Sequence, residues 1–332
     1  MEIKTVTAKR SLLGGDAARR VLAFAALVIL FVVFSILSPE FFPTFENVNG
    51  ILLATSVNGV LALGATFVII TGGIDLSVGT VMTFSSVMTA VFITEMKIPL
   101  LIGVVGGVLA GSLCGFINGV VIAKMKVPPF IATLGMMYIT KGLSLVISQL
   151  HPIYFSDYPG YQNIAMGSVV SGIIPGANIP NAVLIFFGAA IIAGLILAKT
   201  ILGRYAVALG SNEEATRLSG VSVDRWKIGI YALAGAFAGL AGVLIASRLN
   251  SAQPALGAGY ELDAIAAVVI GGTSLAGGEG TILGTLIGAF VKSVLDNGLR
   301  IISVPQEWQI VVTGIIVILA VYLDIIRRRA RK

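Results

Sequence analysis

The stretch at residues 51–94, ILLATSVNGVLALGATFVIITGGIDLSVGTVMTFSSVMTAVFIT, contains two long apolar runs that meet at TGGIDLS. A membrane-spanning helix needs about 20 consecutive, mostly apolar residues, and the segments 51–71 and 78–94 both approach that length. The only carboxylate of the stretch, Asp75, lies close to glycines where the two runs meet. This pattern predicts two membrane helices joined by a short polar segment.

The composition of the whole chain also indicates that the protein lies in a membrane. Hydrophobic residues make up 57% and charged residues 11% of the 332 positions, and the mean hydropathy is +0.99. A soluble domain carries about 25% charged residues, so lipid is the expected surrounding of this chain. Cys114 is the only cysteine, which excludes a disulfide framework within the chain. The excess of basic residues does not indicate nucleic acid, because Lys and Arg collect between the apolar runs.

Hydropathy along the chain predicts an all-α integral membrane protein with about ten transmembrane helices. The expected spans are 21–37, 51–71, 78–94, 99–123, 127–148, 181–198, 228–247, 261–278, 281–298 and 306–323. The span at 261–278 has the weakest support. The resulting organisation is a cytoplasmic segment 1–20, a transmembrane domain 21–326 with long loops at 149–180 and 199–227, and a basic tail 327–332. No small-residue cleavage site follows the first run, so we interpret it as an uncleaved span.

The distribution of basic residues predicts the orientation. If both chain ends are cytoplasmic, seventeen of the 22 Lys and Arg residues fall on the inner side. Only Lys97, Arg248 and Arg300 fall outside, while Lys141 and Lys292 fall within spans. The protein is therefore expected to be multi-pass, with its N- and C-termini in the cytoplasm and the long loop 149–180 outside.

One long charged loop, residues 199–227, lies on the predicted inner side. It contains a stretch that suits a short helix. Asn212 can cap the start of this helix, Glu213 and Glu214 favour its positive end, and Gly220 can terminate it. Such a helix is either a solvated surface element or a helix that docks into a cytoplasmic partner.

The segment around Asp75 also allows two interpretations. Asp75 can cap a helix that begins one or two residues after it. Alternatively, its carboxylate and the hydroxyls of Thr71 and Ser77 can line a translocation path for a polar solute. Asn58 and Asn118 lie within spans, where hydrogen bonds between helices are favoured over a place in that path.

Acidic and basic side chains also occur in or beside the later spans. Lys292 and Asp296 are four residues apart on one helix and can form a pair, which we place near the outer end of the span. Glu261 and Asp263 begin the weakest span, close in sequence to Arg248. These two acids either gate the outer mouth or mark the water boundary.

A weak echo links the two halves of the chain. GGIDL at 72–76 resembles GGTSL at 271–275, and Gly-Thr follows each of them, at 79–80 and at 280–281. Internal duplication leaves remnants of this kind in transporters.

Four motifs resemble those of a known family. The inner loop contains ALGSNEEATRLSG at 208–220, which resembles the EAA motif of ABC importer permeases, with Thr216 in place of the second alanine. TGGIDLSVG at 71–79, PPFIATLG at 128–135 and GAGYELDAIAAVVIGGTSLAGG at 257–278 accompany it. Together these motifs resemble the permease subunits of monosaccharide ABC importers, most closely the ribose type, over residues 45–323.

The resemblance implies a type II importer permease of the bacterial inner membrane that moves ribose or a similar monosaccharide. Two copies would pair in lipid, a cytoplasmic ATPase subunit would bind ATP and Mg²⁺, and a periplasmic sugar-binding protein would deliver the sugar. The chain would then be no enzyme and hold no cofactor or metal, and its lack of any Gly-Lys pair excludes a Walker A motif. The residues implied to couple to the ATPase are Asn212, Glu213, Glu214, Ala215, Thr216, Arg217, Leu218 and Gly220.

Binding proteins commonly dock through acidic residues, so the scarce outer basic residues are candidate docking contacts. These candidates are Arg248 and Arg300, with Glu261 and Asp263 beside them in the predicted topology. An ion-coupled secondary transporter of a small polar solute is the alternative function, although it needs ionisable groups at mid-membrane. An intramembrane enzyme is disfavoured, because the only histidine, His151, lies in the outer loop and Cys114 stands alone.

Overall fold

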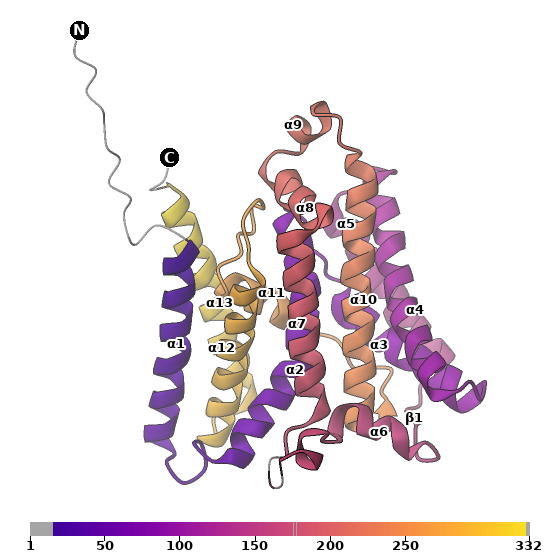
Figure 1. Cartoon of the computed structure of the whole chain (residues 1–332), viewed down its shortest axis with the longest axis vertical. Helices are drawn as coiled ribbons and strands as arrows, with labels where there is room; N and C mark the ends of the chain where they lie inside the picture. Colours follow the sequence, from indigo (N-terminus) through magenta and orange to yellow (C-terminus); the bar gives the residue numbers. More distant parts are fainter. Residues whose placement is uncertain (1–15, 175, 177, 330–332) are drawn as a thin grey trace.

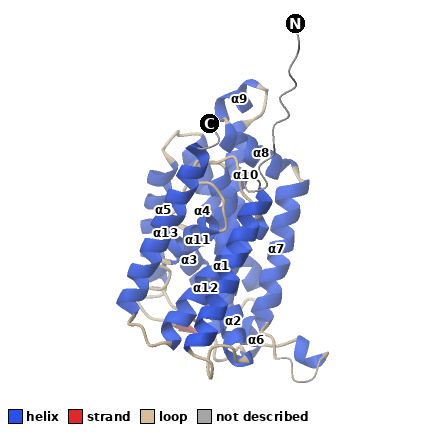
Figure 2. Ribbon diagram, turned by 90° about the vertical axis from the view of Figure 1, so that its left-hand side faces the viewer, coloured by secondary structure: helices blue, strands red, loops and turns tan. Residues whose placement is uncertain are grey.

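Apolar runs become helices in this protein because a helix satisfies its backbone hydrogen bonds internally, which lipid requires. The computed structural model describes residues 16–174, 176 and 178–329, and its long elements are all helices (Figure 1, Figure 2). Most of the predicted N-terminal segment and the last three residues of the predicted tail lie outside the described residues.

The elements follow in chain order. They are α1 (Asp16–Leu37), α2 (Phe45–Ile70), α3 (Val78–Ala90), the π-helical turn η1 (Val91–Glu95), α4 (Leu100–Ala123), α5 (Pro129–Ile147), β1 (Ile153–Tyr154), α6 (Pro159–Met166), the 3₁₀ turn η2 (Val170–Gly172), α7 (Asn181–Lys199), α8 (Ile201–Ser211), α9 (Glu213–Leu218), α10 (Val223–Leu249), β2 (Ser251–Ala252), α11 (Tyr260–Ile270), α12 (Ile282–Ile301) and α13 (Gln306–Arg329).

Within the described residues, seven helices are long and apolar enough to cross a membrane: α2, α3 with η1, α4, α5, α7, α10 and α12. Shorter apolar stretches in α1 and α13 coincide with the predicted first and last spans. The all-helical membrane fold is confirmed. The predicted span 261–278 is wrong, because α11 has only 11 residues and ends at two glycines. Such a helix is about 16 Å long, half of a hydrocarbon core of about 30 Å.

The central helix of the bundle is α2. In its most apolar window 89% of the residues are buried inside the protein, where α2 packs against α7, α10, α11 and α12. Its Thr66 shares a buried hydrogen bond of 2.7 Å with Thr285 of α12. A helix that is apolar on all sides is typical of such a core position.

Glycines let α4 and α10 approach each other closely. An ideal Cβ atom on Gly115 of α4 would lie 2.1 Å from the carbonyl oxygen of Tyr231, and one on Gly235 of α10 would lie 2.3 Å from the carbonyl oxygen of Gly111. No side chain fits at either place. Small residues at a helix contact are the usual way in which membrane helices gain packing energy.

The two ends of the bundle differ in structure. We call one the α9 end, because it holds α9 together with the start of α1 and the end of α13 (Figure 1). The opposite, strand end holds α6 and the antiparallel pair β1–β2, in which Ile153 faces Ala252. There the buried Tyr161 stacks on Phe155, with ring centroids 3.8 Å apart.

The glycine pairs of the sequence echo terminate α2 and α11 with the same geometry. Gly72 has φ 79° and Gly272 has φ 87°, values that favour glycine. The hydrogen bonds that follow each helix also correspond. Gly72 N donates to Ile69 O and Gly272 N donates to Val269 O, both at 2.9 Å. The next residue donates one position further back in each case, Gly73 N to Val68 O at 3.2 Å and Thr273 N to Val268 O at 3.1 Å. The structural correspondence therefore runs one residue out of step with the sequence echo, which matches Gly72 to Gly271.

Candidate functional site

The predicted inner-loop helix exists and is capped as expected. The side-chain oxygen Oδ1 of Asn212 accepts a hydrogen bond from Ala215 N at 2.9 Å, so Asn212 is the N-cap of α9. The hydroxyl of the buried Thr216 donates to the carbonyl oxygens of Asn212 and Ala208, at 2.7 and 3.1 Å. Gly220 has φ 83° and lies just after the helix. The short helix is thus tied to the last turn of α8.

An ion network holds α9 against its neighbours. The Glu213 carboxylate pairs with Lys227 of α10 at 2.6 Å and with Arg217 at 3.2 Å. Arg217 also reaches Asp224 at 3.5 Å, and Asp224 pairs with Lys126, which precedes α5, at 3.1 Å. Exposed pairs stabilise a fold by only about 0–1 kcal/mol each. Their effect here is to fix the position of α9 relative to α10 and the α4–α5 loop.

The outward side of α9 carries different side chains. Leu218 is 83% exposed and Glu214 is also exposed, so both are accessible to a partner. Partial burial acts to raise the pKa of Glu213, but the hydrogen bonds and charges of Lys227 and Arg217 outweigh it and hold that pKa below its ordinary value. Glu213 is therefore ionised throughout the physiological pH range.

The end of α8 touches the ends of two membrane segments. An ideal Cβ atom on Gly210 would lie 1.8 Å from the carbonyl oxygen of Ile70 and 2.4 Å from the amide nitrogen of Gly278. That amide donates to Ile70 O at 2.8 Å. The backbones of α8, the end of α2 and the loop 271–281 therefore meet at Gly210, one turn before α9.

The predicted pathway residues Asp75, Ser77 and Asn118 lie together in one buried network. The Asp75 carboxylate accepts hydrogen bonds from Ser77 N at 2.8 Å and from Ser77 Oγ at 2.6 Å, and Asn118 Nδ2 donates to Ser77 Oγ at 3.0 Å. The cap prediction for Asp75 is wrong by two residues, because Ser77 is the N-cap of α3. Asp75 instead closes a tight turn that fastens the segment before α3 to α4.

The other two predicted pathway residues lie apart from this network. Thr71 follows the last residue of α2, and its hydroxyl donates to Val68 O at 2.7 Å. Asn58 lies in the middle of α2, and its Oδ1 atom is buried without a hydrogen-bond partner among the described residues. The structure thus does not gather the five residues into one site.

The starts of α3 and α11 meet inside the bundle. An ideal Cβ atom on Gly79 of α3 would lie 2.3 Å from the carbonyl oxygen of Gly257 and 2.6 Å from a carboxylate oxygen of Glu261. Both Glu261 oxygens lie 3.1 Å from the amide nitrogen of Gly259, which donates to them. Two positive helix ends and one carboxylate therefore share this junction.

A buried lysine joins α11 to α12. Lys292 is 7% exposed and bonds Asp263 of α11 at 3.1 Å and Asp296 at 2.5 Å. The predicted Lys292–Asp296 pair is confirmed. Its predicted place near the outer end is wrong, because Lys292 lies halfway along the 20-residue α12. Asp263 and Asp296 remain partly exposed, at 32% and 27%.

Glu261 and Asp263 are also not at the outer mouth, which corrects their prediction as docking contacts. The loop 253–259 leaves β2 at the strand end and turns back into the bundle, so α11 begins beside the middle of α12. Glu261 is only 9% exposed there and packs on α3, where a docking protein cannot reach it. Arg248 and Arg300 lie in the last turns of α10 and α12, at the strand end.

Two residues around α9, Asp224 and Gly210, were not predicted from the sequence. Asp224 is the only acid between Glu214 and Glu261, a scarcity that could have identified it as the partner of the surrounding basic residues. Gly210 offers no comparable local pattern, because its contacts come from segments far away in the chain.

Comparison with known proteins shows which protein family the chain belongs to. Residues 47–321 match the family described as the permease component of a branched-chain amino acid transport system. The chain belongs to this family of ABC importer permeases, and as a permease subunit it is not itself an enzyme. The ion-coupled alternative receives no support from this membership.

Among individual relatives, the chain is similar to the ribose import permease protein RbsC of Escherichia coli (strain K12), with 44% identity over 299 residues, 90% of this chain and 91% of the relative. RbsC of Bacillus subtilis (strain 168) is 44% identical over 303 residues, 91% of each chain. The D-allose transport system permease protein AlsC of Escherichia coli (strain K12) is 37% identical over 301 residues, 91% of this chain and 90% of the relative. No solved structure matches the chain. The resemblance to monosaccharide importer permeases is confirmed.

Proposed function

We propose that this chain forms the membrane pathway of an ATP-driven importer for ribose or a similar monosaccharide. The observation that carries the proposal is the capped and clamped helix α9, which stands next to the backbone junction at Gly210. A sugar is favoured over a branched-chain amino acid because the similar ribose and D-allose permeases align over nine-tenths of the chain.

The coupling step uses α9 and its flanks. Leu218 and Glu214 contact a cytoplasmic ATPase subunit, which binds the ATP and Mg²⁺. The ion network of Glu213, Arg217 and Asp224 makes α9 move as one body with the start of α10. The full coupling surface is Asn212, Glu213, Glu214, Ala215, Thr216, Arg217, Leu218 and Gly220.

Movement of α9 then reaches the membrane interior through α8. Its Gly210 contacts Ile70 and Gly278, so a shift of α8 displaces the segment 71–77 and the loop 271–281 together. These two segments lead into α3 and follow α11. The two helices separate or close at their junction, which provides the two states that alternating access requires.

The sugar passes this junction. The partly exposed carboxylates of Asp263 and Asp296 accept hydrogen bonds from sugar hydroxyls, while Lys292, which pairs with both acids, holds them in place. Asp75, Ser77 and Asn118 position the start of α3. Thr71 and Asn58 flank the path from α2.

The α9 end faces the cytoplasm of a bacterial cell and the strand end faces the periplasm. This orientation places the basic residues inside and follows the positive-inside rule. A periplasmic sugar-binding protein docks on the strand end near Arg248 and Arg300, and a second copy of the chain completes the pathway in the inner membrane.

The test is co-purification followed by transport. The tagged protein, extracted gently from its native host, is expected to bring down a P-loop ATPase in a one-to-one ratio. Vesicles holding that complex should take up the sugar only with ATP and the binding protein. Gly220→Val and Glu214→Lys should abolish uptake without removing the protein from the membrane. Sugar flux without an ATPase, or normal uptake in both variants, contradicts the proposal.

A further inference from the structure

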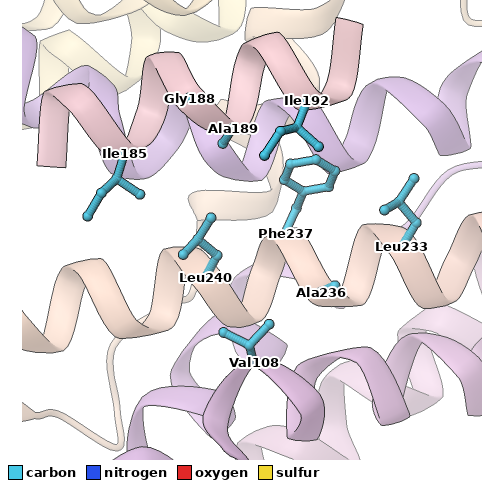
Figure 3. A pocket seen from close by; sticks show the side chains of 9 residues that line it. All are labelled: Val108, Ile185, Gly188, Ala189, Ile192, Leu233, Ala236, Phe237 and Leu240. Atoms are coloured by element: carbon cyan, nitrogen blue, oxygen red, sulfur yellow. The ribbon is translucent and has the colours of Figure 1, made fainter. Parts of the chain in front are cut away.

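Two cavities follow one face of α10. The first lies near the α9 end, has a volume of about 530 Å³, and is bordered by Ile201, Leu202, Tyr205, Gly220, Val221, Ser222, Arg225, Trp226 and Gly229. The second, of about 380 Å³, lies deeper between α7, α10 and α4 and has only apolar side chains around it (Figure 3).

The two cavities lie along the same face of α10. Arg225, Gly229, Leu233, Ala236 and Leu240 recur at intervals of three or four residues, which places them on one face of the helix. Leu240 lies about 22 Å along the axis from Arg225. Nothing lies within 4 Å of an ideal Cβ atom on Gly229, so the face is open at the part of the first cavity that is nearest in sequence to the second.

The first cavity has the chemistry of a membrane surface. Tyr205 and Trp226 pack at one side with ring centroids 4.9 Å apart and their planes tilted by 54°, and such aromatic side chains favour the headgroup level of a bilayer. Arg225 is exposed and lies three residues into α10, next to the positive helix end. The first cavity therefore offers a charged donor and an aromatic wall above an apolar floor.

Arg225, the basic residue that borders the first cavity, is not paired with an acid among the described residues. Lys199 and Arg204, which are close in sequence to the bordering residues of α8, also form no ion pair within the described part of the chain. The nearest acid in sequence, Asp224, already pairs with Lys124, Lys126 and Arg217. The unpaired charge of Arg225 is complementary to an anionic ligand.

The second cavity suits an acyl chain. Ile185, Gly188 and Ile192 of α7 face Leu233 and Leu240 of α10 across it, and the ring of Phe237 forms its floor (Figure 3). The groove would accept a hydrocarbon chain that descends from the first cavity, because every side chain around it is apolar.

We propose that an anionic phospholipid binds along this face of α10, with its phosphate at Arg225 and one acyl chain in the groove between α7 and α10. The headgroup lies beside the loop that connects α9 to α10, since Gly220 and Ser222 border the same cavity. Bound lipid thus braces the coupling helix from the side of the bilayer.

The chain carries its own reporter for a test. Its two tryptophans are Trp226, in the first cavity, and Trp308, on α13. Trp308→Phe therefore leaves a single fluorophore at the proposed site. The full-length variant is placed in phosphatidylcholine vesicles that contain a fixed fraction of brominated phosphatidylglycerol or, separately, brominated phosphatidylcholine. The phosphatidylglycerol should quench Trp226 at about fivefold lower mole fraction, the gain expected from one basic side chain at an anionic surface.

Matched variants locate the effect. Arg225→Gln in the Trp308→Phe background should remove the preference, whereas Arg225→Lys should keep most of it. Gly188→Leu places a side chain where nothing lies within 4 Å of an ideal Cβ atom and should weaken quenching by lipids brominated along the acyl chain. Trp226→Phe, which reports from Trp308, should show no preference.

Three results overturn the proposal. Equal quenching of Trp226 by both lipids excludes anionic selectivity, and this comparison requires no charge variant. A preference that survives Arg225→Gln excludes the phosphate contact. Absence of quenching by either lipid shows that protein, for example a second copy, covers this face.

Discussion

The carbonyl oxygen of Ile70, at the last residue of α2, lies so close to Gly210 of α8 that a Cβ atom on the glycine would approach it to 1.8 Å. A helix end that contacts its neighbour through backbone alone transmits displacement without a flexible side chain between them. This contact stands between α9 and both segments that carry α3 and α11.

Gly210→Ala tests this contact. The new methyl group must push α8 away from Ile70 and Gly278, and overpacking of this kind costs about 1–3 kcal/mol. We expect uptake to fall while ATPase binding persists. The measurement is uptake per unit of ATP hydrolysed in vesicles. Gly194→Ala is the control, because nothing lies within 4 Å of its ideal Cβ atom. Equal uptake in both variants would rule out transmission through Gly210.

Asn212→Ala removes the cap of α9. The loss of one capping hydrogen bond costs about 1 kcal/mol in helix stability, so α9 should fray and bind the ATPase more weakly. Asn212→Asp retains a cap and should restore binding. The measurement is the amount of ATPase that co-purifies at a fixed detergent concentration. Equal recovery from Ala and Asp variants would mean that the cap has no part in coupling.

The lowered pKa of Glu213 predicts a pH profile. A carboxylate whose pKa is lower in the folded than in the unfolded protein stabilises the fold above its ordinary pKa of 4.5, and this contribution is lost as pH falls through the lower, folded value. The attachment of α9 should therefore be constant from neutral pH down to that ordinary value and decline only below it. Hydrogen exchange of α9 amides at several pH values measures this. The prediction would be contradicted if α9 amides exchanged faster as the pH fell from 7 to 5 in the wild-type protein but not in the Glu213→Gln variant.

Lys292→Met removes the cation between two acids in the middle of the membrane. Breaking a buried ion pair by deleting one partner costs about 3–5 kcal/mol, so the melting temperature in detergent should fall. Adding Asp263→Asn and Asp296→Asn to the variant should restore stability. Uptake should stay low in the triple variant, because the acids that receive the sugar are then absent. Full recovery of uptake in the triple variant would show that Asp263 and Asp296 are not part of the sugar pathway.

Arg248→Glu and Arg300→Glu test docking at the strand end. Reversing a charge at the rim of an interface slows association with an acidic partner, and low salt should accentuate the effect. We expect binding-protein-stimulated ATP turnover to fall in each variant while basal turnover is unchanged. Lys97→Glu, outside the predicted docking set, provides the comparison. Unchanged stimulation in both arginine variants would exclude these contacts.

Much of this architecture was predictable from local patterns. The apolar runs placed the long helices within a few residues, and Asn212 and Gly220 marked the ends of α9 because capping depends on residues adjacent in sequence. The same reasoning misplaced the start of α3, since Asp75 and Ser77 are equally good caps by residue type and only the turn geometry separates them.

The interior site was less accessible to sequence reasoning. Hydropathy treats residues 261–278 as one apolar window, whereas Gly271 and Gly272 end the helix halfway. The depth of Asp263 then follows from its bond to Lys292, a contact between separate helices that no periodicity reports. Charged residues near the end of a predicted span were interpreted as boundary residues, and a re-entrant loop moved them inward.

The burial of α2 bears on how the protein is made. In the finished molecule α2 is surrounded by α7, α10, α11 and α12, all of which follow it in the chain and are synthesised later. A nascent chain must therefore hold α2 against lipid until residues near 301 have been inserted, and its all-round apolar surface suits that interim position. The centre of the transporter is accordingly the last part to be completed, although its sequence comes near the beginning.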